Sequence, residues 1–431
     1  GPRAAKPGSS LGAAGRPVGS VARTPVRGWA VVLLCRAQGS SVVLISYTFG
    51  LFLPFIRDDL NISLLQAGLL QGVWWVTAAT AALPFGAWFS RFRPVPVVLV
   101  SLVLSLPFLF MQALATGFVF LLLARLFFVL CHVIATPART LLLQQWAAPR
   151  QYAQINSVGL SQHSVILALA VSTSALFITA AGSWRAAYLL MGGLMLVQAF
   201  AWVLVAQERK APVRDIKSQL NEQEGTPLRA LALYPQAWII AAMMFFLSAT
   251  WTAMVTFLPT LWLEERGVSL TLGGPLLGFL YYGLIPSGLI GGFLAHKIRN
   301  RKLLLGVPAL FNVLFGVTIA FTTNPILLMF LITGLGIVWV ATPAINVLPF
   351  EFPGIRPREV AVISSLVVTF SGLGFAAGPV VTGLVAQFTG SLQTGLVTLC
   401  LLTGLGVVAS AVYPAHARNA APPMLRADGD K

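Results

Sequence analysis

Three basic side chains recur at a seven-residue spacing inside one long apolar stretch. Residues 117–148 are apolar enough to cross a bilayer as a helix, which takes about 20 residues, yet they include Arg125, His132 and Arg139. Because two helical turns take about 7.2 residues, these side chains fall on one face of that helix. A cation near mid-membrane costs roughly 2.5–3.5 kcal/mol, so such residues normally face a bundle interior or a wet cavity. The spacing predicts a cationic stripe turned away from lipid; the plain alternative is that Arg139 reaches to the interface and His132 packs in the core.

The sequence offers these cations no acidic partner at the same depth. All twelve Asp and Glu residues can be assigned to loops, to a polar linker or to the tail. Buried charges need partners, so water, backbone carbonyls or a mobile anion must balance the arginines. Guanidinium groups bind carboxylates and phosphates through two parallel hydrogen bonds. We therefore predict that a small organic anion, with a carboxylate favoured, binds at these arginines.

The composition restricts the class of protein. Of the 431 residues 57% are hydrophobic and only 9% are charged, against about a quarter charged in soluble domains. This is typical of an all-α polytopic membrane protein. The three cysteines, Cys35, Cys131 and Cys400, lie in apolar runs without CxxC spacing, so we expect neither a disulfide framework nor a metal site. Phosphate-loop, HExxH and nucleophile-triad motifs are absent from the sequence, and we expect no cofactor and no enzymatic activity.

Twelve apolar spans would position the basic residues. Their expected bounds are 29–55, 62–90, 95–115, 117–148, 152–182, 184–206, 236–263, 270–296, 301–322, 325–350, 357–388 and 391–413. The longest polar stretch falls between the sixth and seventh spans. The expected organisation is a disordered basic arm (1–27), an N-terminal six-helix bundle (28–206), a cytoplasmic linker (207–235), a C-terminal six-helix bundle (236–413) and a cytoplasmic tail (414–431). The arm also fits a transit peptide, and its first Gly-Pro fits a protease scar.

The distribution of positive charge orients the chain. Of its 28 lysines and arginines, Arg36, Arg125 and Arg139 lie within spans. Among the rest, only Arg57, Arg185 and Arg266 fall in loops on the side away from the linker. Such a bias places both termini in the cytoplasm. It also accounts for the net charge of +16 without nucleic acid as a partner. We expect a monomer in the bacterial inner membrane.

The two halves of the chain match at a shift of 205 or 206 positions. Phe52-Leu53-Pro54 recurs as Phe257-Leu258-Pro259, and Ala135-Thr136-Pro137-Ala138 recurs as Ala341-Thr342-Pro343-Ala344. The acids Asp58 and Asp59 recur as Glu264 and Glu265, and Gly68, Gly72 and Gly86 recur as Gly274, Gly278 and Gly292. A parallel repeat predicts two pseudo-symmetric bundles with a site between them near the midplane. The glycines are expected to let the second span approach the eleventh, and the eighth approach the fifth.

These motifs resemble the major facilitator superfamily. The loop after the second span has Gly86, Arg91 and Arg93, and its second copy has Gly292, Lys297 and Arg299, as in that family's gate signature. Ser90 and His296 stand where the signature carries an acid, so the charge-paired cytoplasmic latch of the family is altered here. The stretch Tyr47–Pro54 is also similar to the first helix of monocarboxylate and oxalate–formate-type porters. The resemblance covers about residues 28–413 and implies transport by alternating access.

The family resemblance implies that spans one, four, seven and ten line a central cavity. The expected substrate-binding residues are Arg36, Tyr47, Arg125, His132, Arg139, Trp251, Thr252, Trp339 and Asn346. For coupling, His132 or His163 could carry a proton in symport, whereas anion exchange would need neither. Efflux of lipophilic drugs is the alternative, although residues 152–182 lack the Gly-Pro motif of such antiporters. A non-transporting sensor or assembly protein is a third reading.

Overall fold

The computed structural model describes residues 25–89, 92–146, 152–207, 230–355 and 357–414. Most of the predicted arm, linker and tail lie outside these residues. Throughout the described parts the secondary structure is helical, without strands. Ten helical segments there are long and apolar enough to cross a membrane, and α2 and α5 complete the set of twelve. The all-α polytopic class predicted from composition is confirmed.

The first six long helices begin and end within a few residues of the predicted spans. They are α1 (Val26–Leu60), α2 (Leu64–Phe89), α3 (Pro94–Ala113), α4 (Phe118–Trp146), α5 (Tyr152–Ala181) and α6 (Trp184–Val205). Tight connections need backbone in the left-handed region, and here Asn61 (φ 51°) and Gly182 (φ 75°) supply it. Pro94, with its fixed φ and no N–H to satisfy, starts α3.

The second half is more interrupted. After the short α8 (Ala230–Leu233), its segments are α9 (Gln236–Thr260) with η3 (Leu261–Glu265), α10 (Leu270–Lys297), α11 (Arg301–Phe321), α12 (Pro325–Ile337) with η4 (Val338–Val340), α13 (Ala341–Val347) and η5 (Leu348–Glu351), α14 (Pro357–Thr389), and α15 (Leu392–Leu402) with α16 (Leu405–Val412). Pro343 cannot donate a hydrogen bond to the carbonyl four residues earlier, at Trp339. The tight 3-10 turn of η4 falls at this point, as expected for a helix relieved of that bond.

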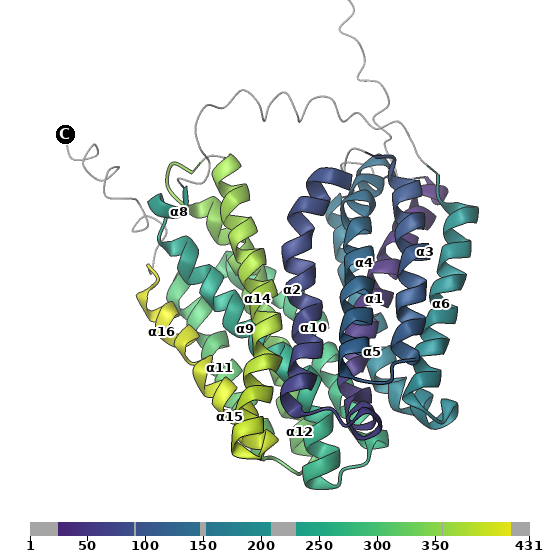
Figure 1. Cartoon of the computed structure of the whole chain (residues 1–431). Coiled ribbons are helices and arrows are strands. Elements are labelled where there is room, and N and C mark those ends of the chain that lie inside the picture. Colours follow the sequence, from purple (N-terminus) through teal and green to yellow (C-terminus); the bar gives the residue numbers. More distant parts are fainter. Residues whose placement is uncertain (1–24, 90–91, 147–151, 208–229, 356, 415–431) are drawn as a thin grey trace, which may run out of the picture.

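The helices form two six-helix bundles standing side by side, α1–α6 and α9–α16 (Figure 1). α6 ends and α9 begins at the upper end in this view, which we call the linker face. α1 ends and α2 begins at the lower end, which we call the opposite face. The bundles meet where α2 packs on α14, α5 on α10 and α1 on α9.

Glycines let the two bundles approach each other closely. A Cβ on Gly72 of α2 would lie 2.8 Å from Val380 Cγ2 of α14, and one on its repeat partner Gly278 of α10 would lie 1.9 Å from Ser172 Oγ of α5. The predicted approach of these two helix pairs is therefore confirmed. A Cβ on Gly50 of α1 would lie 2.0 Å from the Val255 carbonyl oxygen of α9. Gly50, Gly72 and Gly278 all lie within about 15 Å of their helix ends at the opposite face, so the bundles are packed together there.

Candidate functional site

Arg125 of α4 is held entirely within the N-terminal bundle. Its side chain has no exposed area. Nε donates to the Leu70 carbonyl oxygen (3.1 Å), Nη2 to Gln71 Oε1 (2.9 Å) and Nη1 to the Tyr188 hydroxyl (3.4 Å). The guanidinium also lies over the rings of Phe49 (4.1 Å) and Trp74 (5.1 Å). Neutral acceptors and aromatic faces thus stabilise this charge without a carboxylate, and substrate contact by Arg125 stays a prediction.

Arg139, two turns beyond His132 on α4, is only partly satisfied. Nη2 lies 3.3 Å from His132 Nε2 and donates to Thr136 Oγ1 at 3.3 Å. Nη1 is buried and has no hydrogen-bond partner among the described residues. It lies 3.5 Å from the place where a Cβ of Gly39 would be, an ordinary van der Waals distance, so the guanidinium lies directly against α1. A guanidinium only donates, so His132 accepts through Nε2 and is unprotonated at that atom.

Arg36 and His163 join this cluster from α1 and α5. Ser40 Oγ donates to the Arg36 carbonyl oxygen (3.0 Å) and lies 3.0 Å from His163 Nδ1. The charge of Arg36 interacts with both Arg139 and His163. All four basic residues are half-buried. We call Arg36, His132, Arg139 and His163 the basic cluster; all four were singled out from the sequence, and their roles in substrate binding and coupling stay predictions.

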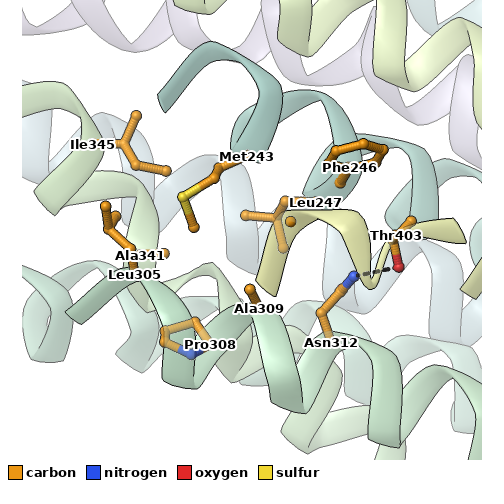
Figure 2. Close-up of a pocket in the computed structure, with 11 residues that line it drawn as sticks. Met243, Phe246, Leu247, Leu305, Pro308, Ala309, Asn312, Ala341, Ile345 and Thr403 are labelled. Atoms are coloured by element: carbon orange, nitrogen blue, oxygen red, sulfur yellow. Dashed lines mark hydrogen bonds between the residues drawn. The ribbon is translucent and has the colours of Figure 1, made fainter. Parts of the chain in front are cut away.

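The expected hydroxyl wall of the C-terminal bundle is occupied by internal hydrogen bonds. Thr252 Oγ1 donates to the Ser248 carbonyl oxygen of its own helix (3.1 Å). Asn312 Nδ2 of α11 donates to Thr250 Oγ1 (2.8 Å) and Thr403 Oγ1 (3.4 Å), as Figure 2 shows in part. Asn312 and Thr403 line a cavity of about 20 Å³, which has room for about one water molecule. Of the other expected residues on this side, Asn346 is exposed.

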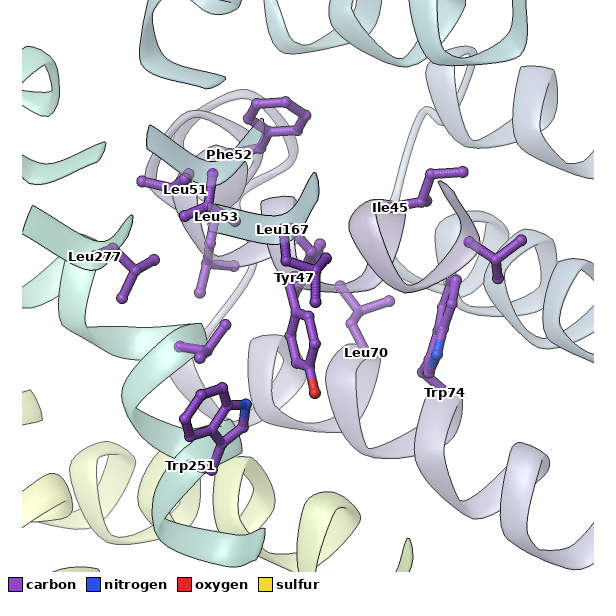
Figure 3. Packing of buried hydrophobic residues seen from close by; sticks show 14 of the residues in the cluster. Ile45, Tyr47, Leu51, Phe52, Leu53, Leu70, Trp74, Leu167, Trp251 and Leu277 are labelled. Atoms are coloured by element: carbon purple, nitrogen blue, oxygen red, sulfur yellow. The ribbon is translucent and has the colours of Figure 1, made fainter. Parts of the chain in front are cut away.

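Aromatic side chains from both bundles form a closed ring of contacts near the middle of the structure. The centroid distances are Tyr47–Trp75 5.8 Å, Trp75–Phe375 4.5 Å, Phe375–Trp339 6.0 Å, Trp339–Trp251 5.2 Å, Trp251–Tyr281 5.5 Å and Tyr281–Tyr47 5.7 Å. Figure 3 shows the side chains of Tyr47 and Trp251 facing each other. We call these six residues the aromatic ring.

The sequence predicted half of the aromatic ring. Tyr47, Trp251 and Trp339 were expected at the site, and the structure brings them together. Trp75 and Tyr281 were missed, although they occupy equivalent positions 206 residues apart in the repeat. That shift, applied to aromatic residues as well as to glycines, would have found both. Phe375 gives no comparable signal.

The gate motif is described only in part. Gly86 lies near the end of α2, and Arg91 falls outside the described residues. Gly292 has open space around its Cβ position. Arg93 and Arg299 are exposed, and Lys297 Nζ lies 5.4 Å from the ring centroid of Phe293.

The three arginines expected on the opposite face all make defined contacts. Arg57 Nη1 lies 2.6 and 2.5 Å from the two carboxylate oxygens of Glu264. This ion pair joins the two bundles. Arg185 pairs with Asp59 (2.7 Å) and donates to carbonyl oxygens at the end of α3. Arg266 donates to carbonyl oxygens at the end of α11. Burial lowers the pKa of Arg266, and the carboxylate of Glu265 partly offsets this.

The chain is similar to known membrane transporters in both sequence and fold. The family model of the Major Facilitator Superfamily matches residues 39–379, which is most of the chain. The chain belongs to the Major Facilitator Superfamily. As a member of that superfamily it is an integral membrane transport protein rather than an enzyme.

Individual relatives within the superfamily are distant. The hexuronate transporter of Bacillus subtilis (strain 168) is 25% identical over 264 residues, which cover 58% of this chain and 61% of that protein's length. The inward-facing, unoccupied structure of a bacterial homologue of the human lysosomal transporter Spinster has a TM-score of 0.71 at 16% identity, covering 91% of this chain and 96% of that one. The nucleoside transporter NupG has a TM-score of 0.67 at 14% identity, covering 90% of this chain and 98% of that one. These structures share the fold.

Proposed function

We propose that this transporter is a secondary carrier that moves a small organic anion, above all a carboxylate, by alternating access. The observation that carries the proposal is the buried Nη1 of Arg139, which lacks a hydrogen-bond partner among the described residues. An unpaired charged donor in a membrane-spanning bundle is costly unless an anion visits it. A carboxylate oxygen would accept a charge-assisted hydrogen bond from Nη1.

The surroundings of Arg139 support an anion rather than a cation. Arg36, His132 and His163 add basic character from three helices, and the hydrogen-bond partners of Arg139, His132 and Thr136, are both neutral. Lipophilic cations, the typical cargo of the drug-efflux alternative, would be repelled by this cluster. The name of the Bacillus subtilis relative describes a sugar acid, itself a carboxylate, as the cargo of that protein.

We further propose that the described conformation is open toward the cytoplasm. The glycine contacts and the Arg57–Glu264 ion pair join the bundles near the opposite face. With the termini in the cytoplasm, as the charge bias predicts, that closed face is external. The likeness in fold to a neighbour solved in an inward-facing conformation supports this orientation.

Coupling would pass through His132. In the described geometry His132 Nε2 accepts from Arg139, so protonating that atom would break the contact and release the guanidinium. A proton and an anion could then be taken up together, as symport. If the carrier is an anion exchanger instead, replacing His132 with Gln would leave exchange intact and the pH gradient would drive no uptake.

Uptake into proteoliposomes tests the assignment. Labelled lactate, oxalate and glucuronate would be supplied with and without a pH gradient, using wild type, Arg139→Gln, Arg139→Lys and the matched control Lys302→Gln on the linker face. A lost charge-assisted hydrogen bond should weaken the apparent affinity about 10- to 100-fold in Arg139→Gln, and less in Arg139→Lys. Lys302→Gln should match wild type. Unchanged anion uptake by Arg139→Gln would overturn the proposal, and transport of lipophilic cations instead of anions would favour drug efflux.

A further inference from the structure

The aromatic ring crosses the interface between the bundles. Tyr47 and Trp75 come from α1 and α2, whereas Trp251, Tyr281, Trp339 and Phe375 come from α9, α10, η4 and α14. Its direct contacts between bundles are Trp75–Phe375 and Tyr47–Tyr281. Tyr47, Trp251 and Tyr281 are buried, but Trp75, Trp339 and Phe375 are only half-buried. Three large π surfaces thus remain partly open at the level where the two bundles meet.

Two polar groups of the aromatic ring lack hydrogen-bond partners. Trp75 Nε1 and the Tyr281 hydroxyl are buried without a partner among the described residues. Buried Trp and Tyr normally find a partner for these groups. Both groups belong to the same ring and occupy equivalent positions in the repeat. Beside these π faces a ligand therefore meets only two unpaired polar groups, Trp75 Nε1 and the Tyr281 hydroxyl.

The neighbouring threonine hydroxyls are fully buried and already donate hydrogen bonds, so they offer a polyhydroxylated cargo neither a free donor nor an exposed acceptor. Thr252 and Thr256 bond carbonyl oxygens of their own helix, and Thr250 is engaged with Asn312 and Thr403. A sugar acid carries several hydroxyls, and each one desolvated without a partner costs about 1–3 kcal/mol. The aromatic ring would therefore favour a cargo with a flat apolar body and few polar groups.

The basic cluster lies within reach of the aromatic ring. The guanidinium of Arg139 contacts α1 at Gly39, eight residues before Tyr47, a rise of about 12 Å along the helix. A helical Tyr side chain leans toward the N-terminal end of its helix, here toward Arg139, which shortens the gap. A molecule with a carboxylate at one end and a ring at the other, joined by a short chain, would span it.

From these four observations we infer that the cargo is an aromatic carboxylate, whose ring lies on Trp75, Trp339 and Phe375 while its carboxylate meets Arg139. This inference rests on the proposed function, which supplies the anionic end. The proposed cargo differs from the sugar acid in the name of the Bacillus subtilis relative.

Calorimetric titration of the purified full chain with three probes tests the inference. The probes are 3-phenylpropionate, 3-cyclohexylpropionate, which has a similar size and charge without a π system, and glucuronate. Aromatic contacts are worth a further three- to tenfold in affinity beyond buried area. We expect 3-phenylpropionate to bind that much more tightly than the cyclohexyl probe, and glucuronate to bind most weakly.

Two matched variants on α14 test whether the preference for the phenyl probe arises from the aromatic ring. Phe375→Leu should abolish the preference for phenyl over cyclohexyl, whereas Phe370→Leu, which contacts Trp238 outside the ring, should retain it. Equal binding of the two propionates, tighter binding of glucuronate, or binding of none of the three would overturn the inference. The proposed function is judged separately, because it requires only that Arg139→Gln weaken whichever anion binds.

Discussion

Arg57 of α1 and Glu264 of η3 form an ion pair that joins the two bundles at the opposite face. Glu264 is the repeat partner of Asp58, but the position equivalent to Arg57 in the second half is Leu263. The second acid of each pair acts within its own bundle, since Asp59 accepts from Arg185 and Glu265 accepts from the Leu392 N–H. The repeat thus conserves the ties within each bundle, and the ion pair across the interface is asymmetric.

Breaking this ion pair should loosen the opposite face. Partly exposed pairs contribute up to about 1 kcal/mol, so Glu264→Gln should raise amide hydrogen exchange in Leu261–Glu265 by up to about fivefold. High salt should reduce the difference between variant and wild type because it screens the pair. Asp58→Asn, in the same cleft, is the control. An equal rise in both variants would show that the effect is not due to the Arg57–Glu264 contact.

Arg125→Gln should destabilise the N-terminal bundle. It removes a buried guanidinium with three hydrogen-bond contacts and two aromatic faces, and leaves Gln71 and Tyr188 without that partner. We expect a loss of about 1–3 kcal/mol in the free energy of unfolding, measured by thermal denaturation in detergent. Arg125→Lys should lose less because it keeps the charge. If Arg125→Gln unfolds as wild type does but fails to take up anions, Arg125 acts on the substrate, as the sequence predicted.

Gly50→Ala should prevent the tight approach of α1 to α9. A Cβ at this position would lie 2.0 Å from the Val255 carbonyl oxygen, a distance that only separation of the helices can relieve. We expect proteoliposome uptake to fall at least tenfold, because the described closed face can no longer form. Gly193→Ala on α6, where the Cβ position is open, should transport normally. Normal uptake by Gly50→Ala would mean that this contact is dispensable.

Thr403→Val should weaken the junction of α9, α11 and the last span. The hydroxyl of Thr403 accepts from Thr250 and Asn312 while donating to the Cys400 carbonyl oxygen. Hydrogen bonds between membrane helices contribute about 0.6–1.7 kcal/mol, so the free energy of unfolding should fall by about that amount. Thr318→Val removes an exposed hydroxyl that bonds only its own helix, and should have little effect. Equal losses in the two variants would contradict a role for the junction.

Sequence periodicity predicted the span bounds well because lipid requires continuous apolar helices, whose ends are marked by charge, Gly and Pro. It also placed two members of the basic cluster, His132 and Arg139, on one helix face together with Arg125. It could not distinguish Arg125 from Arg139. The difference depends on Gln71 and Tyr188, which lie 54 and 63 residues away in the chain and are brought to Arg125 only by packing.

The threonines illustrate the same limit. Thr252 was expected to face the substrate because of its residue type and its span, but the hydroxyl is directed to Ser248 in its own helix. A hydroxyl in an apolar helix has a local acceptor always within reach, so its presence in a span does not indicate its direction.

The contact of Gly50 with the Val255 carbonyl has a mechanical consequence. Two main chains that touch directly have no rotamers to rearrange when they part, and water can solvate the uncovered peptide groups. Such a backbone contact can separate and re-form in the same register in every transport cycle, as a carrier requires.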